Sequence, residues 1–95
     1  MICRAQVSGW TVDVIIDSGS STSIISKGFL DHIKRKVTKS STRKIIGIHG
    51  EQKSSLGIIK EIAVHLGDVV IFADMEVINT NVYNMVLSND WFRRA

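Results

Sequence analysis

Hydrophobic and polar residues alternate along much of this chain, a pattern typical of β-strands with one buried face. The alternation is clear over residues 10–17, where two valines and an isoleucine share one face. In residues 69–77 it places Asp74 and Glu76 on the same face as Phe72, opposite an apolar face. Further strands are predicted over residues 2–7, 43–48, 51–59, 61–66 and 85–87, with an extended segment over 20–25, a hairpin turn at 47–50 and tight turns at 8–9 and 67–68.

Only two segments show helical signals. Apolar side chains at three- and four-residue spacing predict a short helix over residues 27–33, with Ser26 as its N-cap. A cluster of capping residues at 88–90 predicts a final helical turn over residues 91–93. The sum is an all-β chain with one or two short helices, which we expect to form a small closed β-barrel.

The length of 95 residues predicts a single domain, residues 1–95, with one hydrophobic core. No apolar run approaches the roughly 20 residues that a membrane-spanning helix needs, so no membrane segment is expected. No secretory signal is visible at the N-terminus. The single cysteine, Cys3, cannot form an internal disulfide, which fits a reducing compartment.

The formal net charge is +3, and much of the basic excess lies in residues 34–44, KRKVTKSSTRK. Such a run can contact phosphate groups, so a small basic nucleic-acid-binding barrel is one hypothesis. The run contains no aromatic residue for base stacking, which favours a solvated loop instead.

The most informative chemistry follows the strand over residues 10–17. Three β-branched residues lead directly into Asp17-Ser18-Gly19, so a carboxylate is expected at the rim of an apolar sheet. Two interpretations of Asp17 stay open from this pattern: an exposed turn acid, or a catalytic carboxylate.

The other reactive side chains give weaker signals. His32 and His65 have no cysteine or acid at ligand spacing, so no metal site is predicted. Cys3 has no catalytic partners in the sequence and is interpreted as a structural or incidental thiol rather than a nucleophile. Trp10, beside a turn, is expected to be partly exposed.

Four stretches, in order along the chain, together resemble a known family. They are QVSGWTVDVIIDSGSSTSIIS, SKGFLDHI, GIHG followed by SLG, and YNMVLSNDWF. In this order they are similar to retropepsin-type aspartic proteases of long-terminal-repeat retroelements and retroviruses, with the gypsy-like group closest. The resemblance implies a retropepsin-type barrel with a flap hairpin, and an aspartic endopeptidase that needs no metal or organic cofactor.

In that family two aspartates share one proton and activate water between them. This chain contains one Asp-Ser-Gly, so the resemblance implies a homodimer in which each chain contributes Asp17. Gly19 allows a sharp turn beside the carboxylate. Ser18 takes the family's role of bracing the paired loops, so Asp17, Ser18 and Gly19 are the expected catalytic residues.

The resemblance also assigns the residues that contact an extended peptide or polyprotein substrate. They are Ser20, Ser21, Gly47, Ile48, His49 and Gly50, the last four being the flap. His49 has a second interpretation, a solvent-facing turn residue. A histidine at the flap tip can also serve as a specificity or pH-sensing group.

Two departures from the family pattern bear on these expectations. Ser88 stands where the family usually has glycine, which leaves open a catalytically silent module of the same fold, retained for dimerisation or peptide binding. The sequence stops at Ala95, so dimer contacts are expected mainly from the Asp17 loops, the flap tips and nearby helices, giving a weak, concentration-dependent dimer. The family implies a location in the cytoplasm or in virus-like particles, within a larger polyprotein.

Overall fold

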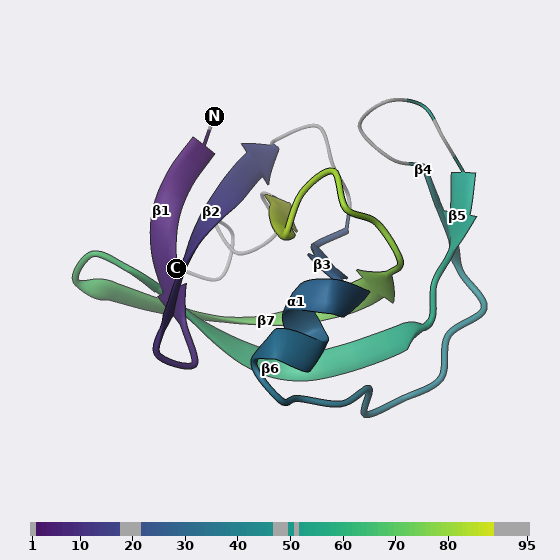
Figure 1. Ribbon diagram of the computed structural model, residues 1–95, viewed down its shortest axis with the longest axis horizontal. Helices are drawn as coiled ribbons and strands as arrows, with labels where there is room; N and C mark the ends of the chain where they lie inside the picture. Colours follow the sequence, from purple (N-terminus) through teal and green to yellow (C-terminus); the bar gives the residue numbers. More distant parts are fainter. Residues whose placement is uncertain (1, 18–21, 47–49, 51, 89–95) are drawn as a thin grey trace.

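The expected barrel is confirmed by a computed structural model, which describes residues 2–17, 22–46, 50 and 52–88 (Figure 1). Within these residues, neighbouring strands close in the order β1-β2-β8-β3-β7-β6. The barrel strands are β1 (Ile2–Val7), β2 (Trp10–Asp17), β3 (Ile24–Ser26), β6 (Gly57–Leu66), β7 (Val69–Ile78) and β8 (Met85–Ser88).

Both hairpins and crossovers build this barrel. The predicted turn at 8–9 connects β1 to β2, and the one at 67–68 connects β6 to β7, so that each pair forms an antiparallel hairpin. Pairing of β1 with β6 completes the closure. The strand β8 lies between β2 and β3, parallel to the first and antiparallel to the second. The last strand that the structure describes therefore borders the one that ends at Asp17.

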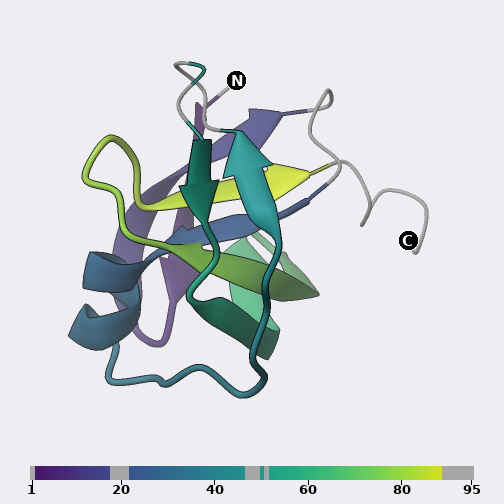
Figure 2. The same cartoon turned by 90° about the vertical axis from the view of Figure 1, so that its right-hand side faces the viewer.

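A separate two-stranded hairpin, β4 (Lys44–Ile46) and β5 (Gln52–Ser54), forms its own sheet. Figures 1 and 2 show that the end of this hairpin where β4 stops and β5 starts points to the same side of the barrel as the C-terminal end of β2. The predicted second arm over residues 51–59 was wrong. Leu56 N donates to Val77 O at 2.7 Å, so the chain leaves the hairpin and enters the barrel as β6.

The strand β6 is also longer and less regular than predicted. It begins at Gly57 and contains a bulge between Ile59 and Ile62, where Glu61 has a φ of 56°. The backbone N–H of Glu61 donates to Asp74 Oδ1 at 2.9 Å. The bulge bends the strand where a barrel this small needs curvature.

The helix α1 (Lys27–His32) begins where the sequence predicts. Ser26 has extended backbone angles, and its hydroxyl accepts a hydrogen bond from Phe29 N at 3.1 Å, which confirms the N-cap. Phe29 and Leu30 are buried against the barrel core. In the part of the chain that the structure describes, no helix is long and apolar enough to cross a membrane.

Apolar side chains pack in two separate clusters. The larger fills the barrel interior and includes Val14, Ile62, Met75 and Leu87, each with no solvent exposure. The smaller lies on the outer face of the neighbouring strands β3, β7 and β8, and it contains Ile45 of the hairpin. Its buried members are Ile24, Ile45, Ile78, Tyr83 and Val86. The second cluster therefore attaches the β4–β5 hairpin to the barrel wall.

Gly57, the first residue of β6, makes a close approach that predicts a large effect of substitution. Its φ is +143°, and an added Cβ would overlap Val37 Cγ1 and lie 2.9 Å from the Lys39 carbonyl oxygen. We expect Gly57→Ala to lower the free energy of unfolding by about 2–4 kcal/mol, measured by urea denaturation.

The matched control for this substitution is Gly67→Ala. Gly67 has a φ of +61° in the β6–β7 turn, with open space around the position of a Cβ. Only backbone strain opposes alanine there, so a loss of about 1–2 kcal/mol is expected. Equal losses in the two variants would contradict the packing argument.

Candidate active site

Asp17 lies at the C-terminal end of β2, half-buried, at the rim of the barrel. The parallel pairing of β2 with β8 places it level with Ser88. Val14 to Ile16, which precede it, pair with the apolar residues of β8. The strand thus buries its apolar part in the barrel wall and carries its terminal acid to the edge, as the sequence predicts.

Ser88 fits into the wall beside Asp17 without exposing its hydroxyl. It is 1% exposed, and its Oγ lies 3.2 Å from Ser23 Oγ. The backbone N–H of Ser88 also donates to Ser23 Oγ, at 3.1 Å. The departure from the family's glycine is therefore accommodated by a local hydrogen-bonded pair of serines.

Several of the expected site residues lie outside the described part of the chain. These are Ser18, Gly19, Ser20, Ser21, Gly47, Ile48 and His49, together with the final helical turn at 91–93. Their assigned roles stay predictions. Gly50 is described: it is exposed in the connection between β4 and β5, with a φ of +83°.

The base of the β4–β5 hairpin, where Ser41 precedes β4 and Ser55 follows β5, packs on a buried acid whose role the sequence analysis missed. Glu76 of β7 is 4% exposed, on the outer face that alternation predicts. Its Oε1 accepts a hydrogen bond from Ser41 Oγ, and its Oε2 accepts one from Ser55 Oγ, both at 2.9 Å. The signal that could have pointed to it is an acid within the apolar run from Met75 to Ile78, which is buried throughout.

A second polar link joins the hairpin base to the segment after Asp17. The Nη1 of Arg43 donates to Thr22 Oγ1 at 3.0 Å, and its Nε lies 3.8 Å from Glu76 Oε1. Thr22 follows the Asp-Ser-Gly segment in the chain. One arginine therefore contacts both the acid beneath the hairpin and Thr22, the residue just before Ser23.

The remaining candidate residues are not gathered at this rim. The His32 ring packs against Trp10 with centroids 4.1 Å apart and the two planes tilted by 59°, and Trp10 is 48% exposed, as expected. His65 is exposed on β6, and Cys3 is half-buried on β1. Among the described residues, no group of three or more histidine, cysteine, aspartate or glutamate side chains could hold a metal ion.

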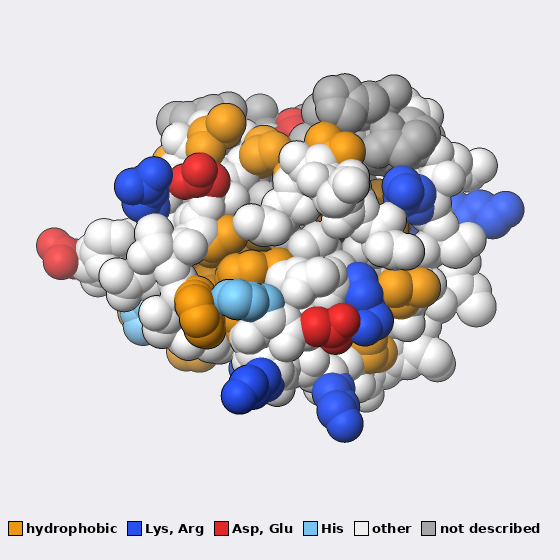
Figure 3. Space-filling view, in the orientation of Figure 1, with side chains coloured by type: hydrophobic (Ala, Val, Ile, Leu, Met, Phe, Trp, Pro, Cys, Tyr) orange, Lys and Arg blue, Asp and Glu red, His pale blue; other side chains and the backbone are white. Residues whose placement is uncertain are grey.

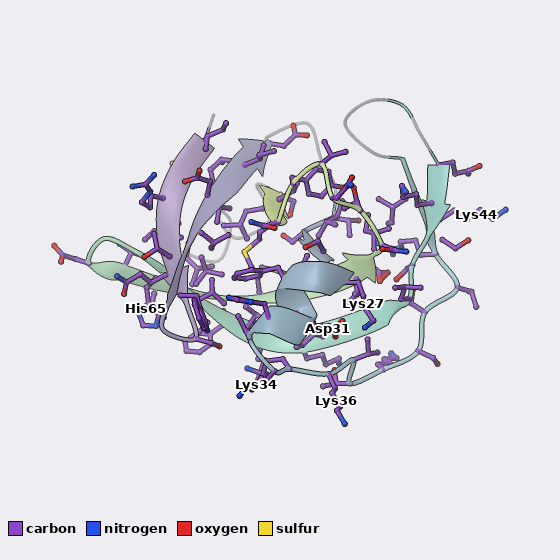
Figure 4. The ribbon with its side chains drawn as sticks, in the orientation of Figure 1. Lys27, Asp31, Lys34, Lys36, Lys44 and His65 are labelled. Atoms are coloured by element: carbon purple, nitrogen blue, oxygen red, sulfur yellow. The ribbon has the colours of Figure 1, made fainter. Side chains whose placement is uncertain are left out.

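The basic run over residues 34–44 follows the outside of the molecule. Figure 4 shows Lys34, Lys36 and Lys44 pointing away from the barrel, and they are exposed. On the face drawn in Figure 3, lysine and arginine side chains are scattered and form no single continuous patch. This arrangement is the solvated one that the sequence favours.

Together, the closed barrel, the attached hairpin and an acid at the end of β2 define a retropepsin-like fold. Residues 3–91 match the family model described as "Aspartyl protease", and the chain belongs to that family. A comparison with curated proteins found no match.

Solved structures of three proteins show the same fold. The retroviral protease-like domain of Ddi1 from Leishmania major is 20% identical, with a TM-score of 0.76 over 99% of this chain and 75% of that one. EIAV protease, complexed with the inhibitor HBY-793, is 16% identical, with a TM-score of 0.75 over 99% and 86%. A retropepsin-like aspartic protease from Rickettsia conorii is also 16% identical, with a TM-score of 0.71 over 100% and 78%.

The serine pair beside Asp17 generates a stability prediction. Ser23→Ala removes both hydrogen bonds to Ser88, so we expect the free energy of unfolding to fall by about 1–2 kcal/mol. Ser54→Ala, at an exposed position of β5, is the control and is expected to change it by less than about 0.5 kcal/mol. Urea denaturation measures both, and a Ser23→Ala loss no larger than the control's would rule out a stabilising pair.

Proposed function

We propose that this chain is one half of a homodimeric aspartic endopeptidase, with Asp17 of each subunit forming the catalytic dyad. The observation that supports it best is the position of Asp17, at the end of β2 in the barrel of an aspartyl protease family member. Ser18 and Gly19 complete the motif in the sequence.

The single Asp-Ser-Gly is the reason for proposing a dimer. Hydrolysis without a covalent intermediate needs a base for the water and an acid for the leaving amine. Two of the other described aspartates form ion pairs away from this rim: Asp13 pairs with Arg4, and Asp31 with Lys27. A second copy of the chain, related by two-fold symmetry, supplies the missing carboxylate.

In the proposed reaction the two carboxylates together accept one proton and return one. The ionised Asp17 takes a proton from water, and the resulting hydroxide forms a bond to the scissile carbonyl carbon. The protonated Asp17 of the other subunit polarises the carbonyl oxygen. The C–N bond then breaks, and the amine leaves with a proton from the dyad.

The proposed substrate is an extended peptide, bound as an added strand between the barrel rim and the β4–β5 hairpin. Ser20 and Ser21 would contact its backbone from below, and the flap at 47–50 would cover it. A gypsy-like retroelement or viral polyprotein is the proposed source of such peptides, and the cytoplasm or a virus-like particle the proposed location. Nucleic acid is not a proposed partner of this domain.

One observation favours a second candidate, a catalytically silent module of the same fold. Ser88 occupies the place of the family's glycine beside the carboxylate, and its hydroxyl lies 3.2 Å from Ser23 Oγ. Such a module would dimerise or bind peptides without cutting them. Measuring peptide hydrolysis separates the two candidates.

Replacing the proposed catalytic acid tests the endopeptidase directly. We expect Asp17→Asn to lower kcat/KM for a generic peptide by at least about 100-fold, because the amide can neither take nor give the proton. The wild-type activity should be sensitive to pepstatin. Asp13→Asn, an exposed acid on the same strand, is the control and should stay within about twofold. Undiminished hydrolysis by Asp17→Asn would eliminate the proposal.

Mixing subunits tests whether the site is shared. At concentrations that saturate the dimer, an equal amount of Asp17→Asn chain should reduce activity per wild-type chain to about half, because half of its partners are inactive. On dilution, specific activity should fall as the dimer dissociates. A wild-type activity unaffected by the variant and by dilution would show that a single chain is sufficient.

A further inference from the structure

The buried acid Glu76 lies where the β4–β5 hairpin joins the barrel. Its two carboxylate oxygens accept hydrogen bonds from opposite sides of the hairpin base: Ser41 precedes β4, and Ser55 follows β5. A carboxylate buried without such partners is strongly unfavourable, and these hydroxyls supply the partners. Hydrogen bonds to Glu76 therefore attach both the segment before β4 and the segment after β5 to one residue of β7.

Each of the two hydroxyls is itself fixed by the backbone. Ser41 Oγ accepts from Arg43 N at 3.2 Å, and Ser55 Oγ accepts from Gly57 N at 3.1 Å. Ser55 N donates to Arg43 O at 2.8 Å, which joins the two sides of the hairpin base to each other. These bonds hold both hydroxyl oxygens beside the acid, although the single Ser55 proton also has Gly57 O, at 3.0 Å, as a second acceptor.

The same position of β7 is bonded to the strand wall beside Asp17. Glu76 N donates to Ser23 O at 2.9 Å, and Ser23 Oγ is the partner of Ser88. Ser88 is level with Asp17 across the β2–β8 pairing. Apart from the helix cap Ser26, the buried polar residues in the described part of the chain are the members of this one network: Ser23, Ser55, Glu76 and Ser88.

The apolar contact between hairpin and barrel lacks this directionality. Ile45 packs in the smaller cluster with Ile24, Ile78 and Val86, and such packing tolerates small shifts of the hairpin over the surface. Hydrogen bonds to a charged acceptor fix both distance and direction. The polar network therefore sets where the hairpin stands relative to the rim that carries Asp17.

We propose that Glu76 is a positioning residue that holds the substrate-covering hairpin in register with the Asp17 rim. This inference rests on the proposed endopeptidase for its effect on catalysis. The hold itself is a property of the unliganded protein.

Hydrogen exchange of the folded protein tests the hold without any substrate. In Glu76→Gln one acceptor oxygen becomes an NH₂ donor, so the amides of β4, β5, Ser55 and Leu56 should exchange about tenfold faster. Amides of the β1–β2 hairpin should keep their wild-type rates. The control, Asp74→Asn, removes an acid two residues earlier on the same strand that does not contact the hairpin, and should leave β4 and β5 unchanged.

Kinetics test the positioning role. In Glu76→Gln, KM for a peptide should rise about tenfold while kcat stays within about threefold, because the hairpin covers substrate less well but the dyad is intact. A purely structural loss would instead lower kcat, through fewer folded molecules, at unchanged KM.

A second variant covers the case in which Glu76→Gln does not fold. Ser41→Ala keeps the buried acid and its bond to Ser55, and should accelerate exchange in β4 and raise KM by a smaller factor. Unchanged exchange at the hairpin, or an equal increase throughout the barrel, would overturn the proposal. If the wild-type protein hydrolyses no peptide, the proposed function fails, and the exchange data still decide whether Glu76 holds the hairpin.

Discussion

The structure depends on the parallel pairing of β2 with β8. That pairing inserts the last described strand between two strands from the first third of the chain, and it sets Asp17 level with Ser88. Without it β2 would be an edge strand, and its terminal acid would have no fixed surroundings. The same strand pairing therefore closes the barrel and fixes the position of the Asp17 carboxylate.

The outer face of the barrel is as important to the site as its interior. On this face β7 changes character along its length: Phe72 is exposed, whereas Glu76 and Ile78 lie under the hairpin. Apolar packing through Ile45 supplies attraction, and the hydroxyl–carboxylate contacts supply direction. The base of the hairpin is therefore attached to the barrel wall by both apolar and polar contacts.

Much of this architecture was predictable because it is local. Alternation identified β2 and β7 and the face of each residue over 69–77, and Ser26 marked the start of α1. The division of residues 51–59 between β5 and β6 was missed, because it depends on a hydrogen bond from Leu56 to Val77. A bond between segments so far apart leaves no periodic signal near either residue.

The candidate site was likewise predictable only in its local features. The motif at Asp17 was visible as a carboxylate after three β-branched residues, and the structure places it at the rim. The burial of Glu76 was not visible, since alternation assigns a side chain to a face but does not say which other segment covers that face. The pairing of Ser23 with Ser88 spans 65 residues and could be found only in three dimensions.

The position of β8 in the barrel has a consequence for biosynthesis. A ribosome releases β2 long before β8, and during that interval the wall beside Asp17 does not exist. The carboxylate acquires its fixed surroundings only after nearly the whole domain has left the exit tunnel. The rim that carries Asp17 is therefore among the last parts of the barrel to form.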